Sequence, residues 1–190
     1  MAIPRRIVVA TATLASLALV VTAQTASAAA LVLGAGLATV CSKAAIAGRS
    51  DPKSIETCTI ALETQAMGPR DRAGTFVNRG VLKLRRRSYD ESRSDFAAAL
   101  RLKPDLGEAY VNWGASLIAQ ARYGEGLSEI DRGLALGVDE PAKAWFNRAI
   151  ALEGLDDPKA AYLAYQKAAE LAPDWKEPQV QLTRFTVSRR

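Results

Sequence analysis

Histidine is absent from this sequence of 190 residues. It is the side chain that most often ligates metals, acts as a general base or changes charge near neutral pH. Without it, a serine nucleophile lacks the imidazole that usually activates it. The acidic side chains are all accounted for as helix caps, turns or exposed helix faces. The sequence therefore predicts a protein that is not an enzyme and has no metal site and no cofactor.

A large excess of charge of one sign is also missing. The chain has 25 basic and 20 acidic side chains, which give a formal net charge of +5. Arg5 and Arg6 are the only charged residues among the first 28, so 23 basic and 20 acidic side chains remain in the rest of the chain. This balance does not indicate nucleic-acid binding.

Long apolar runs are missing except near the N-terminus. There, Ile7 to Val21 form an apolar stretch of 15 residues, which is shorter than the roughly 20 that span a bilayer. Two arginines precede it, and Ala26-Ser27-Ala28 follows with small residues where a signal peptidase requires them. Residues 1–28 are therefore predicted to be a secretory signal peptide, with no stable membrane insertion after cleavage. The protein is expected to be exported, and to be periplasmic if bacterial or otherwise secreted.

Cysteine is scarce, because Cys41 and Cys58 are the only two. Export would place both in an oxidising compartment, where disulfides form. Residues 29–72 are predicted to be an N-terminal helix pair whose second helix opens at Pro52, with Asp51 as its N-cap. A Cys41–Cys58 disulfide would staple these two antiparallel helices.

Three alternatives to these N-terminal predictions stay open. The apolar stretch could be retained as a membrane anchor. The protein could be a lipoprotein cleaved at Cys41, although that residue lies far beyond the apolar stretch. The two cysteines could be redox-active thiols, although their spacing is not C-x-x-C.

One pattern occurs three times between residues 73 and 175. Asn78-Arg79-Gly80, Asn112-Trp113-Gly114 and Asn147-Arg148-Ala149 are spaced 34 and then 35 residues apart. Each is followed by a short polar break and a second apolar-periodic segment. A fixed period in the thirties is typical of a solenoid built from paired helices.

Residues 73–175 resemble three tetratricopeptide repeats, helix–turn–helix units of 34 residues, at 73–106, 107–140 and 142–175. The first unit matches the family's pattern at Phe76, Gly80, Tyr89, Phe96, Ala99 and Pro104. Val138 replaces the terminal proline of the second unit, and Pro158 replaces the tyrosine that opens the second helix of the third. The resemblance implies an all-α, right-handed solenoid of antiparallel helix pairs. Residues 176–190 are expected to form a capping helix with Asp174 as its N-cap.

The resemblance also implies that the first helices of the pairs line a concave groove that receives an extended peptide or partner segment. Asn78, Asn112 and Asn147 stand at the sixth place of each unit, where a carboxamide can pair with both the C=O and the N–H of a peptide. This resembles the asparagine ladder of O-linked N-acetylglucosamine transferases, and local hydrogen bonds are the alternative. The other predicted partner-binding residues are Val81, Arg85, Ala115 and Ile150. The family's carboxylate clamp for acidic chain ends is not expected, because Val77 and Val81 stand in its places.

Charge is distributed unevenly along the repeats. Residues 73–106 carry eight basic and four acidic side chains, including Arg85-Arg86-Arg87, whereas residues 107–140 carry two basic and six acidic ones. This pattern favours electrostatic registration of a charged partner, or weak head-to-tail self-association. Solvated helix ends are the simpler alternative.

Together these features predict a scaffold or adaptor that binds a protein or an extended peptide outside the cytoplasm and binds no nucleic acid. A periplasmic chaperone or holdase for unfolded segments is one alternative. A small-molecule-binding protein or an enzyme that uses the groove is another.

Overall fold

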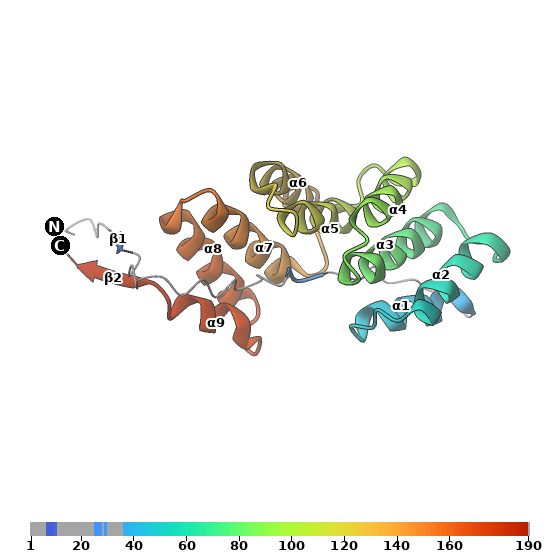
Figure 1. Ribbon diagram of the computed structural model, residues 1–190, viewed down its shortest axis with the longest axis horizontal. Coiled ribbons are helices and arrows are strands. Elements are labelled where there is room, and N and C mark those ends of the chain that lie inside the picture. The colour runs from blue at the N-terminus through green and yellow to red at the C-terminus, as the bar shows by residue number, and fades with distance from the viewer. Residues whose placement is uncertain (1–6, 11–24, 28, 30–35, 190) are drawn as a thin grey trace.

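The computed structural model describes residues 7–10, 25–27, 29 and 36–189. In this part of the chain nine helices follow one another, and the first eight form pairs that stack along one axis (Figure 1). The predicted solenoid of helix pairs is therefore confirmed. None of these helices is long and apolar enough to cross a membrane. The helices are α1 (Leu37–Ile46), α2 (Pro52–Thr64), α3 (Pro69–Arg85), α4 (Tyr89–Leu102), α5 (Gly107–Ile118), α6 (Tyr123–Leu136), α7 (Pro141–Gly154), α8 (Pro158–Leu171) and α9 (Lys176–Leu182).

The N-terminal helix pair, α1 and α2, is joined by the predicted disulfide between Cys41 and Cys58, whose Cα atoms are 4.9 Å apart. Both cysteines are fully buried, in the same apolar cluster as Phe96 of α4. The Asp51 carboxylate accepts the N–H of Ser54 at 3.0 Å and caps α2, which begins at Pro52 as predicted. Hydrogen bonds from the side chains of Ser54 and Arg49 lower the pKa of Asp51 to about 2.

The same turn joins the two helices in each of the three repeated pairs. Arg87, Ala121 and Asp156 adopt the left-handed backbone conformation, with φ values of 64°, 59° and 59°. The residue after each of them donates its N–H to a carbonyl five residues earlier, as Ser88 does to Lys83 at 3.0 Å. These bonds satisfy carbonyls that the end of a helix would otherwise leave unpaired. The left-handed conformation is unfavourable for residues other than glycine. Since none of the three residues is glycine, the packing of the two helices must hold this conformation.

Gly114 brings α5 and α6 into close contact. A Cβ at this position would lie 2.6 Å from Cγ1 of Ile130 and 2.7 Å from the carbonyl oxygen of Gly126. In the preceding pair, a Cβ at Gly80 would likewise lie 2.5 Å from Cε1 of the Phe96 ring. Small residues on the first helix therefore set the spacing within these two pairs.

We expect Gly114→Ala to lower the free energy of unfolding by about 2 kcal/mol, because the added methyl group meets backbone that cannot move without displacing α6. Gly124→Ala is the matched control, since a Cβ at Gly124 meets no atom within 4 Å. It should be neutral or slightly stabilising, because alanine favours the helix. Urea unfolding followed by circular dichroism measures both. Equal unfolding midpoints for the two variants would contradict the close contact.

Val138 stands where the repeat pattern has a terminal proline, and other contacts hold the connection between the second and third repeated pairs. Gly137 adopts a φ of 88°, which leads the chain away from the end of α6. The side chain of Glu108, at the start of α5, then accepts the N–H of Asp139 at 3.0 Å. This bond holds the connection against α5, so the second unit closes without a terminal proline.

The C-terminal end differs from the sequence prediction of a helix over residues 176–190. Helix α9 ends at Leu182, and strand β2 (Thr186–Arg189) follows it. β2 pairs antiparallel with strand β1 (Ile7–Ala10), with Ile7 opposite Arg189. The β-branched residues Thr186 and Val187 favour an extended chain over a helix, which explains the difference. Residues 1–6, 11–24 and 28 of the predicted signal peptide lie outside the described residues.

The predicted Asp174 cap is also wrong, because Trp175 is the N-cap residue of α9 and makes no side-chain cap bond. The Trp175 ring instead packs on Phe146 of α7, with ring centroids 4.9 Å apart. Tyr165 and Arg184 both donate to Glu153 Oε2, at 2.7 and 2.6 Å. Burial, together with this carboxylate, raises the pKa of Tyr165. Contacts of Trp175 before α9 and of Arg184 after it with the third repeated pair, rather than a local cap, therefore position this helix.

Candidate partner-binding surface

Helices α3, α5 and α7, the first helices of the three repeated pairs, lie side by side. We call the side of this row that carries Asn78, Asn112 and Asn147 the inner surface. Three residues after each asparagine stand the apolar residues predicted to line the groove. All six side chains are buried, with at most 5% of their surface exposed. The apolar residues are Val81, Ala115 and Ile150.

Asn147 uses both ends of its carboxamide on the main chain of one distant residue. Its Oδ1 accepts the N–H of Ala26 at 2.9 Å, and its Nδ2 donates to the carbonyl oxygen of Ala26 at 2.7 Å. The two residues are 121 positions apart in the sequence. This pairing is the one that a carboxamide can make with any peptide main chain, but its partner is this chain itself.

Asn112 makes a different bond. Its Nδ2 donates to the carbonyl oxygen of Glu108, one turn earlier in α5, at 2.8 Å. This is the local hydrogen bond that the sequence left open as an alternative. Asn78 is fully buried at the equivalent position of α3. A ladder that uses all three asparagines stays a prediction.

Residues 25–27 and 29, which we call the N-terminal segment, lie along the inner surface between α7 and α3 (Figure 1, blue). Ala26 packs against the buried cluster that contains Phe146 and Ile150. Ala29 packs against the cluster that contains Val77 and Val81. The segment therefore contacts both apolar clusters of the repeats.

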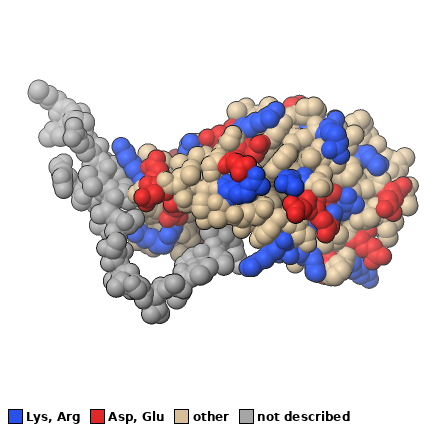
Figure 2. All heavy atoms as spheres, turned by 45° about the horizontal axis from the view of Figure 1, so that its top comes forward, with Lys and Arg blue, Asp and Glu red and all other residues tan. Residues whose placement is uncertain are grey.

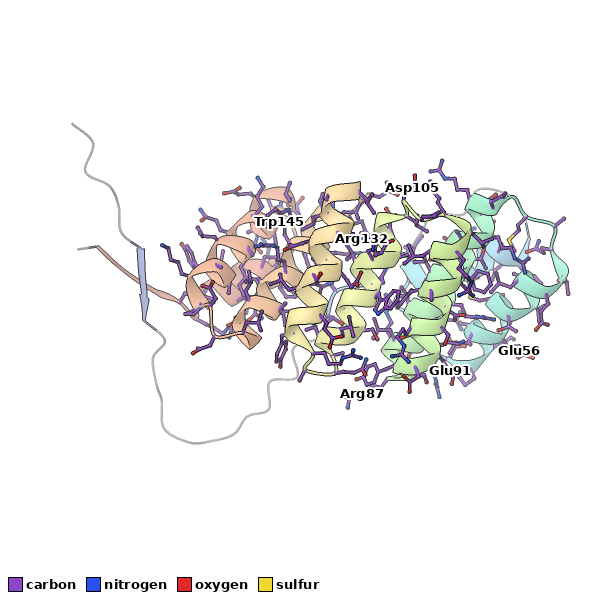
Figure 3. All side chains as sticks on the ribbon, turned by 90° about the horizontal axis from the view of Figure 1, so that it is seen from above. Glu56, Arg87, Glu91, Asp105, Arg132 and Trp145 are labelled. Carbon is purple, nitrogen blue, oxygen red and sulfur yellow. A yellow bond between two sulfur atoms is a disulfide. The ribbon has the colours of Figure 1, made fainter. Side chains whose placement is uncertain are left out.

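Arg85 does not lie with the other predicted partner-binding residues. Its guanidinium donates to the carbonyl oxygen of Ala45 at 2.8 Å and to that of Arg49 at 3.4 Å. Arg86 donates to the carbonyl oxygen of Ser50 at 3.1 Å. Burial lowers the pKa of Arg85. These arginines therefore hold the C-terminal end of α1 against the first repeated pair. Their positive charges are favourable there because the C-terminal end of a helix carries a partial negative charge. Arg87, in contrast, is exposed and lies with Glu91 at one edge of the solenoid (Figure 3).

Charges on the surface are interspersed. Basic and acidic side chains stand next to one another on the face that Figure 2 shows. Lys103 pairs with Asp105 at 2.9 Å, and Arg122 pairs with Glu125. These short-range pairs fit the interpretation of solvated helix ends, and the electrostatic registration of a partner stays a prediction.

A buried ion network, which the sequence analysis missed, holds α3 against α4. Asp95 is 3% exposed, and its carboxylate accepts two bonds from Arg79, at 2.6 and 3.0 Å. Lys83 contacts the same carboxylate at 3.0 Å. Arg79 also donates to Thr59 of α2 at 3.1 Å. The network orients the first helix of the inner surface against both of its neighbours.

A hollow of about 230 Å³ lies over α4, α5 and α6, and none of the predicted partner-binding residues lines it. Trp113 and Leu117 form its apolar part, and its remaining lining residues are Arg93, Arg122, Glu125, Ser128 and Glu129. Among the described residues, no group of three or more cysteine or carboxylate side chains could hold a metal ion.

Residues 142–175, which span α7 and α8, match the family model of the tetratricopeptide repeat. The described helices form a tetratricopeptide-repeat solenoid. The match covers the same residues as the third predicted unit, and the two preceding pairs repeat its turn.

Solved tetratricopeptide-repeat structures share this fold at low sequence identity. The Arabidopsis OM64 TPR domain has a TM-score of 0.56 and 18% identity, covering 62% of this chain and 96% of that one. MamA (41-end) from Desulfovibrio magneticus RS-1 has a TM-score of 0.56 and 18% identity, covering 78% and 82%. The first TPR of Spaghetti (RPAP3), solved with the HSP90 peptide SRMEEVD, has a TM-score of 0.55 and 20% identity, covering 59% and 88%. No curated protein sequence matches the chain significantly.

Proposed function

We propose that this tetratricopeptide-repeat protein is a non-enzymatic scaffold that binds an extended segment of another protein along its inner surface. The observation that carries the proposal is the pair of hydrogen bonds between Asn147 and the main chain of Ala26. Because both bonds go to backbone groups, the same carboxamide can hold an extended segment of any sequence. Val81, Ala115 and Ile150 are buried, with at most 5% of their surface exposed, so the main-chain hydrogen bonds carry the proposed recognition.

The chemistry of the inner surface favours recognition of a main chain over recognition of a charged chain end. Val77 and Val81, at the two places where the family's clamp carries polar residues, are fully buried. The Spaghetti structure contains a bound peptide, which supports peptide binding by this fold. The ligand proposed for the present chain is an extended, uncharged segment rather than an acidic chain end.

We also propose that the protein acts outside the cytoplasm. Two features support this placement: the signal-peptide pattern of residues 1–28 and the disulfide between Cys41 and Cys58. Disulfides persist in oxidising compartments and are rare where glutathione keeps thiols reduced.

The test is crosslinking in the cells that produce the protein, where its N-terminus can be processed, followed by mass spectrometry. Wild type is compared with Asn147→Leu, which keeps the size of the side chain and removes both hydrogen bonds. We expect one or two proteins to be enriched with wild type, and their binding to weaken by about 1 kcal/mol in the variant. Gln166→Leu is the matched control, because Gln166 is an exposed carboxamide on α8.

Three outcomes are informative. Partners that are lost with Asn147→Leu and kept with Gln166→Leu support the scaffold. A broad set of unrelated proteins would identify a holdase instead. Identical partner sets for all three proteins would show that the inner surface does not bind them, and the proposal would fail.

A further inference from the structure

The inner surface is already contacted by a piece of this chain, and the contact has the chemistry expected of a ligand. Ala26 is held through its N–H and its C=O, at 2.9 and 2.7 Å. The residues on both sides of it, Thr25 and Ser27, belong to no helix or strand and are half-buried. In peptide recognition, main-chain hydrogen bonds supply affinity, whereas pockets for side chains supply specificity.

The side chains of this segment are uniformly small. Residues 25–30 read Thr-Ala-Ser-Ala-Ala-Ala and carry no charge. Ala26 and Ala29 place methyl groups against the two apolar clusters of the repeats. A methyl group fits against a packed cluster without displacing it, whereas a large side chain would force the cluster to rearrange.

We propose that the N-terminal segment is an internal occupant of the partner site, and that the partner is an extended polypeptide segment with small, uncharged side chains that competes for the same place. The inference rests on the proposed function, and it adds the class of ligand and a means of regulation. An occupant tethered by a short linker acts at an effective concentration on the order of millimolar. The full chain therefore rejects weak ligands until the segment leaves.

Cleavage after Ala28, where the sequence predicts a signal-peptidase site, would remove Ala26 from the protein. Asn147 would then lose both hydrogen bonds to Ala26 and could take a segment from another polypeptide. The proposed regulation is thus coupled to processing of the N-terminus, and the full chain is its blocked form.

The first measurement asks whether the segment occupies the site in solution. Amide hydrogen exchange of the full chain, resolved at Ala26, should show a protected N–H, because it is bonded to a buried carboxamide. Asn147→Leu should remove that protection, and Gln166→Leu should leave it unchanged. An unprotected Ala26 amide in wild type would overturn the occupancy.

The second measurement asks whether a peptide of the same chemistry competes. The probe is a fluorescent synthetic peptide with the sequence of residues 22–31, TAQTASAAAL, titrated against the full chain and read by anisotropy. Ala26→Pro removes the N–H that Asn147 binds and should tighten binding of the probe about 5- to 10-fold, the equivalent of one hydrogen bond. Gln166→Leu, which changes an exposed carboxamide on α8 and leaves both bonds to Ala26 in place, should bind the probe as wild type does. Adding Asn147→Leu to Ala26→Pro should abolish the gain.

The outcomes separate this inference from the proposed function. A gain with Ala26→Pro that disappears in the double variant supports the internal occupant and the ligand class. If Ala26→Pro binds the probe no better than wild type, the inference is wrong, whereas partners that depend on Asn147 in cells would still support the scaffold. If neither the probe nor any such partner binds, both fail.

Discussion

Substitution of Asp95 by Asn is expected to lower the free energy of unfolding by about 3 kcal/mol, as for other buried charges that lose their partner. The carboxylate neutralises Arg79 and Lys83, whose side chains are only 16% and 13% exposed. Asn keeps the shape of the side chain but not its charge, so Arg79 faces a neutral acceptor in a largely dehydrated place. Lys83 keeps its 3.4 Å pair with Glu91, whose side chain is 67% exposed. Urea unfolding at neutral pH measures the loss.

The control for Asp95→Asn is Asp90→Asn, one turn earlier in α4. Asp90 pairs with Arg93 at 3.2 Å, but its side chain is 88% exposed. An exposed ion pair contributes about 0–1 kcal/mol, so this variant should unfold close to wild type. If both substitutions lower the free energy of unfolding by the same small amount, the Asp95 network is no stronger than a surface ion pair. Because Arg79 also contacts Thr59 of α2, Asp95→Asn should increase hydrogen exchange in α2 as well as in α3 and α4.

Removal of the Cys41–Cys58 disulfide is the second large expected effect. The bond closes a loop with a sequence separation of 17, for which the loss of chain entropy in the unfolded state corresponds to about 3 kcal/mol. The double variant Cys41→Ala/Cys58→Ala keeps the site apolar and should lose this amount. The loss should be concentrated in α1 and α2, because this pair has a neighbouring pair on one side only among the described helices.

Hydrogen exchange distinguishes a local effect from a global one. In the double variant, amides of α1 and α2 should exchange faster, whereas those of α7 and α8 should keep their wild-type rates. Wild type treated with reductant should reproduce the variant. Unfolding midpoints that are identical for oxidised and reduced wild type would show that Arg85 and the apolar contacts hold the pair without the disulfide.

Several features of this protein could be predicted because they depend on short-range patterns. The period of 34 and 35 residues determines the helix pairs, since helices of this length with an apolar stripe can bury it only against a neighbour. Asp51 followed by Pro52 marks the start of α2, because a cap and its proline act within one turn. The pairing of the two cysteines followed from their being the only two, on adjacent helices.

Other features could not be predicted because they depend on contacts between distant residues. The three asparagines look alike in sequence, yet Asn112 bonds to a carbonyl in its own helix, whereas Asn147 bonds to Ala26. Arg85 looks like part of an exposed basic run, but the end of α1 lies beside it and uses its donors. In both cases the partner is chosen by how the stacked pairs place the chain, which no local pattern encodes.

The sequence by itself therefore determined the repeated helix pairs and the disulfide, because helical periodicity and turn chemistry are local. Only the tertiary structure decided what covers the inner surface and where the last helix lies. Those outcomes depend on the main chain of Ala26 reaching a carboxamide 121 residues away, and on Trp175 and Arg184 finding partners in the third pair.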